Sequence, residues 1–332
     1  MKTIRWGIIG CGNVTEVKSG PGFQKSKHSQ LVAVMRRNGD LARDYALRHN
    51  VPKWYDNADE LINDPDVDAV YIATPPAFHK EYTIKCAQAG KPVYVEKPMA
   101  RNFEECTEMI QACENAGVPL FVAYYRRALD RFNKVKELVD SGEIGEIRFV
   151  SITLYRRPIQ IDLNSGKMPW RVNPEISGGG EFHDLASHTL DVLDYILGPI
   201  KEASGYAANQ ANLYEAEDIV TASLSFASGV KGVGIWCFSS FSDYDMNEIV
   251  GSKGKISFST FGAEPVLLTT LDGITEIHIK KPLHIQQQLI QSIVNDLNGL
   301  EVCKSKGISA ARTNWVMDEI LKNYRISSHY RY

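Results

Sequence analysis

The feature that most constrains the fold is a regular alternation of short apolar runs with helical patterns over residues 1–124. Runs rich in β-branched and aromatic residues lie at 3–9, 31–35, 69–72, 93–95 and 120–124, with a shorter one near Trp54. Helical patterns separate most of these runs, which suits crossovers between parallel strands better than hairpins. The first half is therefore predicted to be α/β, a doubly wound parallel sheet with helices on both faces.

A glycine turn follows the first run, in the order Gly10-Cys11-Gly12-Asn13-Val14-Thr15. The pattern G-x-G-x-x-T differs in its last residue from the dinucleotide fingerprint G-x-G-x-x-G/A. Gly10 is expected to make the tight turn, and Gly12 to let a pyrophosphate approach the backbone. A strand before the turn and a second strand about 20 residues later complete the expected context. The first half is therefore predicted to be a Rossmann-type dinucleotide-binding domain.

The second run ends in Arg36 and Arg37. An NAD site of this type places Asp or Glu here, to accept a hydrogen bond from the ribose 2′-hydroxyl. Guanidinium groups suit a 2′-phosphate instead, because they bind phosphate bidentately and can lie against the adenine ring. We therefore expect NADP as cofactor, with NAD as the second choice and a solvated strand end as the alternative for both arginines.

The segment from Lys18 to Gly22 interrupts any long first helix, because it holds a proline between two glycines. A solvent-facing loop is the expected structure. A place for Lys18 beside the cofactor is the alternative.

The run at 93–95 stops on Glu96-Lys97-Pro98. Open parallel sheets bind ligands at the carboxyl ends of their strands, so we predict that Lys97 stands at the centre of an active site. A solvated Glu–Lys pair is the alternative. The run before it leads into Ala73-Thr74-Pro75-Pro76, an extended turn at the same edge, next to His79. Whether the Lys97–Pro98 bond is cis is left open by the sequence.

Strand patterns dominate the second half, at 147–155, 219–226, 230–238, 248–250, 255–258, 266–270 and 274–279. Glycine-rich turns join several of them, which predicts one mostly antiparallel sheet. Helical patterns at 185–197, 285–300 and 309–322 make this half an α+β domain. We place the boundary after residue 123, which gives domains at 1–123 and 124–332.

The informative segment of the second half is three glycines, 178–180, followed by Asp184 and His188. Asp184 and His188 are four residues apart, so they share one helical face. A carboxylate beside a histidine orients the ring and supports its charged form, which makes His188 a candidate general acid or base. A capping aspartate and a satisfied helix histidine are the alternative. A metal site with His183 ranks lower, because no further cluster supplies ligands, and no metal is predicted.

Composition limits the partners. A formal net charge of -3 gives no electrostatic reason to expect nucleic acid or an anionic membrane. No apolar run approaches the roughly 18 residues of a membrane helix, and the first residues show no signal-peptide pattern. The 6 cysteines include no C-x-x-C pair, so reduced thiols and a cytoplasmic location are expected.

Taken together and in order, these motifs resemble the glucose–fructose oxidoreductase / inositol dehydrogenase (Gfo/Idh/MocA) family. The resemblance rests on G-C-G, A-T-P-P, E-K-P and G-G-G followed by D-x-x-x-H, and it covers nearly the whole chain. It implies an N-terminal Rossmann domain and a C-terminal domain with a large open sheet that serves substrate binding and oligomerisation. A homodimer or homotetramer through the exposed face of that sheet is implied.

The resemblance also assigns residues by their place in these motifs. It implies a catalytic group of Lys97, Asp184 and His188. The cofactor-binding residues are expected to be Gly10, Cys11, Gly12, Asn13, Val14, Arg36, Arg37, Ala73, Thr74, Pro75, His79, Glu96, Lys97, Trp170 and Arg171. Many members have asparagine where this chain has Tyr125, which puts the contacts there in doubt.

The expected activity is that of an NAD(P)-dependent oxidoreductase acting on a CH–OH group of a sugar, polyol or related small molecule. His188 would exchange the proton with the substrate oxygen, Lys97 would stabilise its developing charge, and Asp184 would orient His188. Substrate contacts are expected from Lys97, Tyr125, Tyr155, Trp170, Asp184, His188 and His284, with anion contacts from Arg156 and Arg157 as a weaker indication. The alternative is a non-catalytic sensor of a dinucleotide or sugar, which would not need the Lys–Asp–His group.

Overall fold

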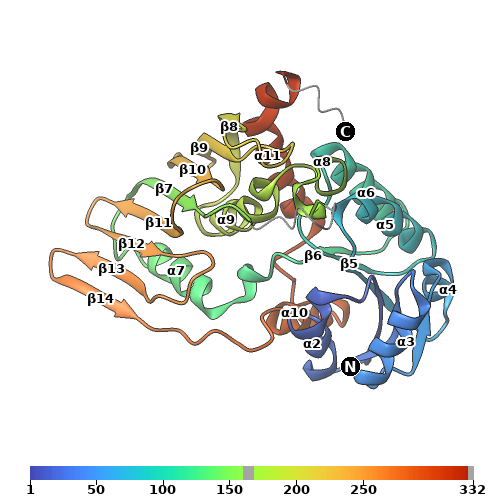
Figure 1. Ribbon diagram of the computed structural model, residues 1–332. Helices are drawn as coiled ribbons and strands as arrows, with labels where there is room; N and C mark the ends of the chain where they lie inside the picture. The colour runs from blue at the N-terminus through green and yellow to red at the C-terminus, as the bar shows by residue number, and fades with distance from the viewer. Residues whose placement is uncertain (160–167, 328–332) are drawn as a thin grey trace. The chain divides into compact units, whose positions relative to one another are not determined.

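The computed structural model describes residues 1–159 and 168–327, and the chain divides into two compact units (Figure 1). The first unit comprises 1–129 and 282–311, and the second comprises 130–281 and the chain from 312 onward. The boundary predicted after residue 123 lies six residues before the end of the first stretch (129 minus 123). The larger difference is that 282–311, assigned to the second domain from the sequence, belongs to the first unit.

All residues of the first unit are described, and its strands form one six-stranded sheet in the order β3-β2-β1-β4-β5-β6. Every neighbouring pair is parallel. The strands are β1 Ile4–Ile9, β2 Ser29–Met35, β3 Lys53–Tyr55, β4 Ala69–Ile72, β5 Val93–Val95 and β6 Leu120–Val122. The helices are α1 Asn13–Val17, α2 Gly20–Lys25, α3 Gly39–Arg48, α4 Ala58–Asn63, α5 His79–Gln88, α6 Phe103–Asn115 and α10 Gln287–Leu297, with short 3₁₀ turns η1 Pro76–Phe78 and η2 Tyr125–Ala128. The predicted doubly wound parallel sheet is confirmed, and its strand order reverses between β1 and β4, where such sheets bind ligands.

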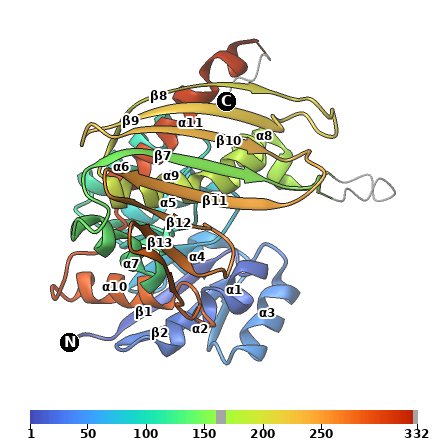
Figure 2. The ribbon, with the colours of Figure 1, turned by 90° about the vertical axis from the view of Figure 1, so that its left-hand side faces the viewer.

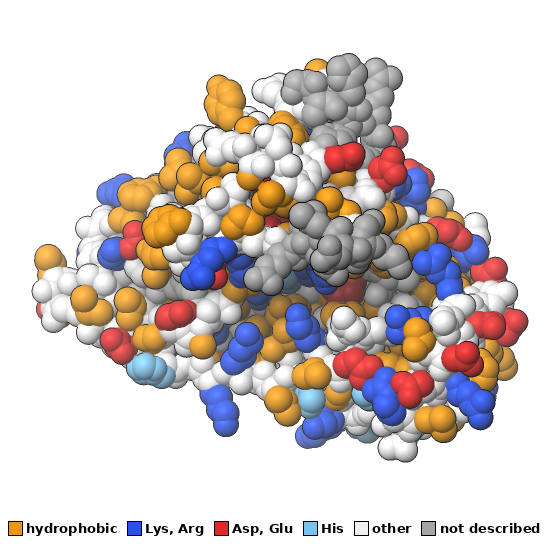
Figure 3. All heavy atoms as spheres, in the orientation of Figure 1, with side chains coloured by type: hydrophobic (Ala, Val, Ile, Leu, Met, Phe, Trp, Pro, Cys, Tyr) orange, Lys and Arg blue, Asp and Glu red, His pale blue; other side chains and the backbone are white. Residues whose placement is uncertain are grey.

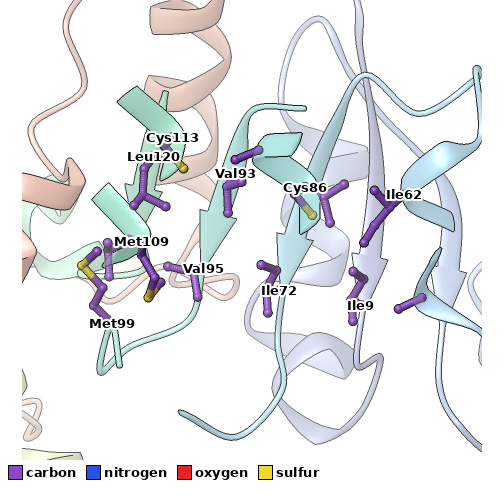
Figure 4. Close-up of a cluster of buried hydrophobic side chains, with 14 of the residues drawn as sticks. Ile9, Ile62, Ile72, Cys86, Val93, Val95, Met99, Met109, Cys113 and Leu120 are labelled. Atoms are coloured by element: carbon purple, nitrogen blue, oxygen red, sulfur yellow. The ribbon is translucent and has the colours of Figure 1, made fainter. Parts of the chain in front are cut away.

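Both faces of the first sheet are buried, because its central strands are apolar at successive positions. Successive side chains of a strand point to opposite faces. Val93 and Val95 therefore join a cluster of buried side chains with residues of α4, α5 and α6. Figure 4 shows this cluster in close-up. Tyr94 points to the other face and stacks on Tyr71, with ring centroids 4.7 Å apart. Phe23 of α2 packs against Tyr71 on that side at 5.2 Å.

The segment that starts at Gly20 is helix α2, so the solvent-facing loop expected there is wrong, although Lys18 itself is exposed. Pro21 lies in the first turn of α2, where its missing N–H removes no helical hydrogen bond. Gly22 is buried, and a Cβ there would lie 2.8 Å from Ile290 Cδ1 of α10. The glycines therefore allow close packing of α2 where the sequence indicated only a break.

Residues 282–311 return to the first sheet through specific hydrogen bonds. The Tyr94 hydroxyl donates to Gln286 Oε1 at 2.7 Å. The Ser305 hydroxyl donates to the carbonyl of Val122 at 2.7 Å, and the Val122 N–H donates to the carbonyl of Ser305 at 3.1 Å. Such a return is a long-range pairing, which the local patterns used to place the boundary do not contain.

The described strands of the second unit form an eight-stranded sheet in the order β14-β13-β12-β11-β7-β10-β9-β8. They are β7 Ile147–Tyr155, β8 Ile200–Ala208, β9 Ile219–Phe226, β10 Lys231–Cys237, β11 Tyr244–Gly251, β12 Gly254–Phe258, β13 Val266–Thr270 and β14 Gly273–Ile277. The helices are α7 Asp130–Asp140, α8 Pro174–Ser177, α9 Glu181–Leu197 and α11 Gly307–Ser327, with the 3₁₀ turn η3 Trp170–Val172. The start of α11, up to Ala311, belongs to the first unit. Only β7 and β10 pair in parallel within this described sheet, so the prediction of a mostly antiparallel sheet is confirmed.

One face of the second sheet builds a core and the other is open. Trp236 of β10 is buried and meets Phe182 of α9 edge-on, with ring centroids 5.1 Å apart. Gly205 of β8 lies so close to α11 that a Cβ would be 2.7 Å from Ile320 Cγ2. Figure 2 looks onto the opposite face of the sheet, with α9 and α11 behind the strands. The open face carries the alternate residues of β10, among them Val233 and Ile235.

Surface and thiol chemistry bear on the predicted partners. Acidic and basic side chains both occur on the face of the molecule shown in Figure 3. No helix in the described ranges is long and apolar enough to cross a membrane. The cysteines at all six positions lie in the described ranges and are free thiols.

Candidate active site

Four strands of the first sheet end at one edge, and each is followed there by residues predicted to bind the cofactor. Gly10 follows β1, Arg36 follows β2, Ala73 follows β4 and Glu96 follows β5. Parallel strands place their carboxyl ends on the same side of a sheet. The structure therefore brings the glycine turn, the two arginines, the A-T-P-P turn and Lys97 to one edge.

The glycine turn passes directly against the turn after β4. Gly10 has a φ of +89°, and a Cβ there would lie 2.9 Å from Thr74 Cγ2. Only glycine fits both the dihedral angle and the space. Thr15, the departure from the usual fingerprint, closes the turn: the Gly12 N–H donates to its Oγ1 at 3.0 Å, and its hydroxyl donates to the Gly12 carbonyl at 2.8 Å. The threonine thus supplies hydrogen bonds at a position usually given to a small residue.

The residues at this edge fit a phosphate-bearing dinucleotide. The Thr74 Oγ1 atom is buried and has no hydrogen-bond partner in the described part of the chain. Arg36 and Arg37 are exposed, and neither guanidinium forms an ion pair with a described residue, although Arg37 lies over the Phe78 ring at 5.3 Å. A Cβ on Gly12 would meet no atom closer than 3.8 Å, which leaves the backbone accessible. Cys11 is buried, which raises the pKa of its thiol to about 11, so this thiol stays protonated.

His79 ties the turn after β4 to the turn after β5. Its Nδ1 lies 3.1 Å from the carbonyls of Pro98 and Met99, and its Nε2 lies 2.8 Å from the carbonyl of Thr74. Burial lowers the pKa of His79, while the three carbonyls act in the opposite direction. The ring thereby fixes the two turns that flank the edge.

Glu96 is buried and accepts hydrogen bonds from three sides. The Tyr71 hydroxyl and the Gln286 side-chain amide both donate to Oε1, the amide at 2.7 Å, and the Lys97 N–H donates to Oε2 at 3.0 Å. This network holds the start of the E-K-P turn. Lys97 is half-buried beside it, and the Lys97–Pro98 peptide bond is cis.

Two residues predicted to contact the substrate also lie in the first unit. Tyr125 is buried in η2, with the Arg126 guanidinium 5.0 Å from its ring centroid. His284 Nδ1 donates to the Val17 carbonyl at 2.8 Å, because a carbonyl only accepts. His284 therefore packs on the end of α1, whereas the sequence had placed it in the second domain.

In the second unit, Asp184 and His188 lie one turn apart on α9, which begins directly after the three glycines. Arg171 Nε is 3.5 Å from Asp184 Oδ2, and the Arg171 guanidinium lies over the Trp170 ring at 4.5 Å. His188 is buried, and Phe261 meets its ring edge-on at 5.8 Å. The structure thus brings four of the predicted site residues together in this unit.

The two arginines after β7 have different surroundings. The Arg156 guanidinium lies 5.0 Å from the centroid of Phe261, the ring that also contacts His188. Arg157 is exposed, and its N–H donates to Asp243 Oδ1 at 2.8 Å. Tyr155, which ends β7, stacks on Tyr244 with centroids 5.2 Å apart. Of the two, only Arg156 is thereby linked to the surroundings of His188.

Sequence reasoning missed Glu181 and Tyr214. Glu181 is 9% exposed and Tyr214 6% exposed. The Glu181 Oε2 atom and the Tyr214 hydroxyl have no hydrogen-bond partner among the residues that the structure describes. Leaving one buried polar group without a hydrogen bond costs about 1–3 kcal/mol, so two such atoms in one unit require an explanation. The available signal was the spacing, because Glu181 precedes Asp184 by one helical turn.

The predicted catalytic residues fall into two groups, with Lys97 on the first unit and Asp184 and His188 on the second. Within the described residues, no group of three or more His, Cys, Asp or Glu side chains is arranged to hold a metal ion.

Comparisons with known proteins match both units. Residues 4–124 match the model of the oxidoreductase family with an NAD-binding Rossmann fold, and residues 132–257 match that of the GFO/IDH/MocA C-terminal domain. The chain is 40% identical to Oxidoreductase P35 of Formosa agariphila, over 88% of this chain and 90% of that protein. It is 32% identical to the myo-inositol 2-dehydrogenase of Thermotoga maritima, over 81% of this chain and 79% of that protein.

Solved structures agree over the full length. The WlbA dehydrogenase of Bordetella pertussis, in complex with NADH and UDP-GlcNAcA, covers 98% of both chains at 26% identity with a TM-score of 0.81. The aldose-aldose oxidoreductase of Caulobacter crescentus covers 98% of both chains with a TM-score of 0.84, and at 24% identity it shows a common fold.

We expect Glu181→Gln to stabilise the protein at about pH 8 and to change little at about pH 4. Burial raises the pKa of Glu181 from 4.5 to about 7, with Asp184 acting in the same direction and Arg156 in the opposite one. The contribution of the neutral carboxyl is complete below the unfolded value of 4.5 and is lost as the pH rises through about 7. Glutamine resembles the neutral carboxyl at every pH, so the free energy of unfolding should rise at the higher pH by up to about 3 kcal/mol.

Urea denaturation at the two pH values measures this difference. Glu143→Gln, at an exposed glutamate of the same unit, is the control and should show no gain that depends on pH. An equal effect of Glu181→Gln at both pH values contradicts the expectation.

Proposed function

The chain belongs to the Gfo/Idh/MocA family of oxidoreductases, and on that premise we propose that it uses NADP to oxidise a hydroxyl group of a sugar or polyol, or to reduce the corresponding ketone. The observation that carries the proposal is the edge of the first sheet, where the Gly10 turn, the unpaired Thr74 hydroxyl and Lys97 lie together. An NAD(P)-binding Rossmann domain with a lysine at its ligand edge is what a dehydrogenase needs.

The preference for NADP rests on the end of β2. Arg36 and Arg37 stand where an NAD site would carry an acidic residue, and both are exposed. An unpaired guanidinium binds a 2′-phosphate through charge-assisted hydrogen bonds, whereas it offers little to a 2′-hydroxyl. Phe78, beneath Arg37, holds that guanidinium near the turn after β4.

A bound nicotinamide dinucleotide supplies the hydride donor or acceptor. In the proposed site, a ring nitrogen of His188 takes the proton of the substrate hydroxyl, and it returns that proton in the reverse direction. The Lys97 ammonium donates a hydrogen bond to the same oxygen and stabilises the negative charge that develops there. Asp184, which pairs with Arg171, lies one turn from His188 on α9 and orients its ring.

The substrate class is proposed from the relatives and from the chemistry of the second unit. A relative 32% identical to this chain is named a myo-inositol 2-dehydrogenase. Tyr155, which was expected to contact the substrate, lies in one row with Cys237 on the open face of the sheet, opposite to α9. Trp170 offers an aromatic face against which a ring substrate can pack. A small neutral polyhydroxylated ring therefore fits the proposal.

We further propose that the open face of the second sheet binds a second copy of the chain, in a homodimer or homotetramer. Tyr206, Thr221 and Ile235 lie in one row across β8, β9 and β10 on that face. Tyr206 is 83% exposed and Ile235 is 39% exposed. Exposed large side chains such as Tyr206 and Ile235 on one sheet face are typical of a surface that another subunit covers.

Lys97→Met and His188→Gln should each lower kcat by about a hundredfold or more, because each removes a group that acts on the reacting oxygen. Turnover of myo-inositol, D-glucose and 1,5-anhydro-D-fructose with NADP or NADPH measures kcat, and the fluorescence of bound NADPH checks that the cofactor site persists. The exposed residues Lys27 and His278 provide the controls Lys27→Met and His278→Gln. Normal turnover by both active-site variants would refute the assignment.

Arg36→Glu should weaken NADPH binding by about ten- to hundredfold, the effect of losing one charge-assisted phosphate contact. The affinity for NADH should change far less. Fluorescence titration of the purified protein with NADPH and NADH measures both. Lys27→Glu makes the same charge change before β2, at the opposite edge of the sheet, and should leave the preference intact. Equal affinity of the unaltered protein for the two cofactors argues against NADP preference.

Ile235→Glu should convert the oligomer to monomers, because it places a charge at the centre of the proposed contact face. Light scattering coupled to size-exclusion chromatography reports the molar mass. Leu47→Glu, which makes the same kind of change at an exposed leucine of the first unit, should leave the mass unchanged. A monomeric unaltered protein would rule the contact out.

A further inference from the structure

The first turn of α9 carries a buried carboxyl group that the proposed mechanism does not use. Glu181 is the first residue of α9, three residues before Asp184 and seven before His188. Residues with this spacing lie on one face of a helix. Glu181 therefore projects from the helical face that carries the proposed acid–base pair.

A second chain segment packs against the start of α9 and brings Tyr214 to the same region. A Cβ on Gly180 would lie 2.9 Å from Ala216 Cβ, and the Gly180 N–H donates to Glu217 Oε1 at 2.9 Å. Tyr214 and Ala216 form a buried apolar cluster with Val172. Val172 directly follows Arg171, the ion-pair partner of Asp184, in the chain.

Two buried polar atoms of this region, Glu181 Oε2 and the Tyr214 hydroxyl, have no hydrogen-bond partner in the described chain. Glu181 acts electrostatically on Tyr214. Buried side-chain polar atoms are nearly always hydrogen-bonded, to protein or to ordered water. They come from separate elements, so one local irregularity does not explain both. An additional group that offers both a donor and an acceptor would satisfy the two together.

The charges around Glu181 favour a neutral partner. Arg156 is the basic group that acts on Glu181, and Asp184 is the acidic one. Burial raises the pKa of Tyr214, and Glu181 raises it further, so the phenol keeps its proton. Glu217, behind Gly180, and Asp218 add negative charge on the side of Tyr214. A negatively charged ligand group would meet these carboxylates, whereas a hydroxyl group meets no repulsion.

We propose that Glu181 and Tyr214 form a subsite for a substrate hydroxyl other than the one that reacts. The subsite rests on the proposed function, since it needs a substrate held at His188. It makes the natural substrate a molecule with at least two hydroxyl groups, one at His188 and one about two helical turns away along α9, at Glu181. The carboxyl of Glu181 accepts a hydrogen bond from that second hydroxyl, and the phenol of Tyr214 donates one to its oxygen. A mono-alcohol leaves both atoms unpaired and is selected against.

The experiment compares Glu181→Gln and Tyr214→Phe with the unaltered protein on three alcohols: myo-inositol, trans-cyclohexane-1,4-diol and cyclohexanol. The 1,4-diol holds its two hydroxyl groups at opposite ends of the ring, as two residues seven apart on α9 require. For the first two, kcat/KM should fall about ten- to hundredfold in each variant, mainly through a higher KM. For cyclohexanol, kcat/KM should not change in either variant. The ratio of kcat/KM for the polyols to that for cyclohexanol should therefore fall. The affinity for NADPH, read from nicotinamide fluorescence, should stay the same. Glu143→Gln is the matched control at an exposed glutamate of the same unit.

A measurement on the unaltered protein covers the case in which a variant does not fold. An ionised Glu181 accepts a stronger hydrogen bond than a neutral one, so the preference for the diol over cyclohexanol should rise as the pH passes about 7. A preference that is constant with pH and unchanged in both variants overturns the subsite, and it leaves an ordered water as the occupant. If none of the three alcohols is oxidised, the proposed function fails and the subsite fails with it. If the polyols are oxidised and both variants keep the KM of the unaltered protein, the subsite is overturned and the proposed function stands.

Discussion

The ligand edge of the first unit depends on the burial of one carboxylate, Glu96. A buried charge is tolerated only where hydrogen bonds replace the lost water, and breaking such a pairing typically costs several kcal/mol. Glu96 receives these bonds from Tyr71, Gln286 and the Lys97 N–H. Gln286 ties residues 282–311 to Glu96, and the Lys97 N–H bond holds the start of the turn that follows β5. The position of Lys97 follows from that turn.

Two carboxyl groups on helix α9 of the second unit have different surroundings. Asp184 pairs with Arg171, whose Nε lies 3.5 Å from Asp184 Oδ2. Glu181, one turn earlier, is buried with no described hydrogen-bond partner at Oε2, and burial raises its pKa to about 7. The difference in their partners supports an orienting role for Asp184 and a ligand-binding role for Glu181.

The sequence predicted the parts of the fold that local patterns encode. The alternation of strand and helix gave the parallel sheet, and the glycine turn and E-K-P stretch fell at one edge because each follows a strand. Helix α2 was missed because proline and glycine usually break helices. The structure shows that Gly22 is needed for the close packing of α2 against α10, which the local sequence does not reveal. The return of 282–311 and the burial of Glu181 arise from long-range contacts, which spacing along the chain does not reveal. The assignment of His284 to the second domain differs from the structure for the same reason.

The central claim is that Lys97 and His188 act on one substrate oxygen. The most direct test is the distance between Lys97 Nζ and the nearer ring nitrogen of His188 in a crystal structure with NADP bound. If both atoms contact one oxygen at about 3 Å, they lie no more than about 6 Å apart, with the nicotinamide ring beside them. The account predicts that result. Two groups at separate sites, with no ligand atom within reach of both, would contradict it.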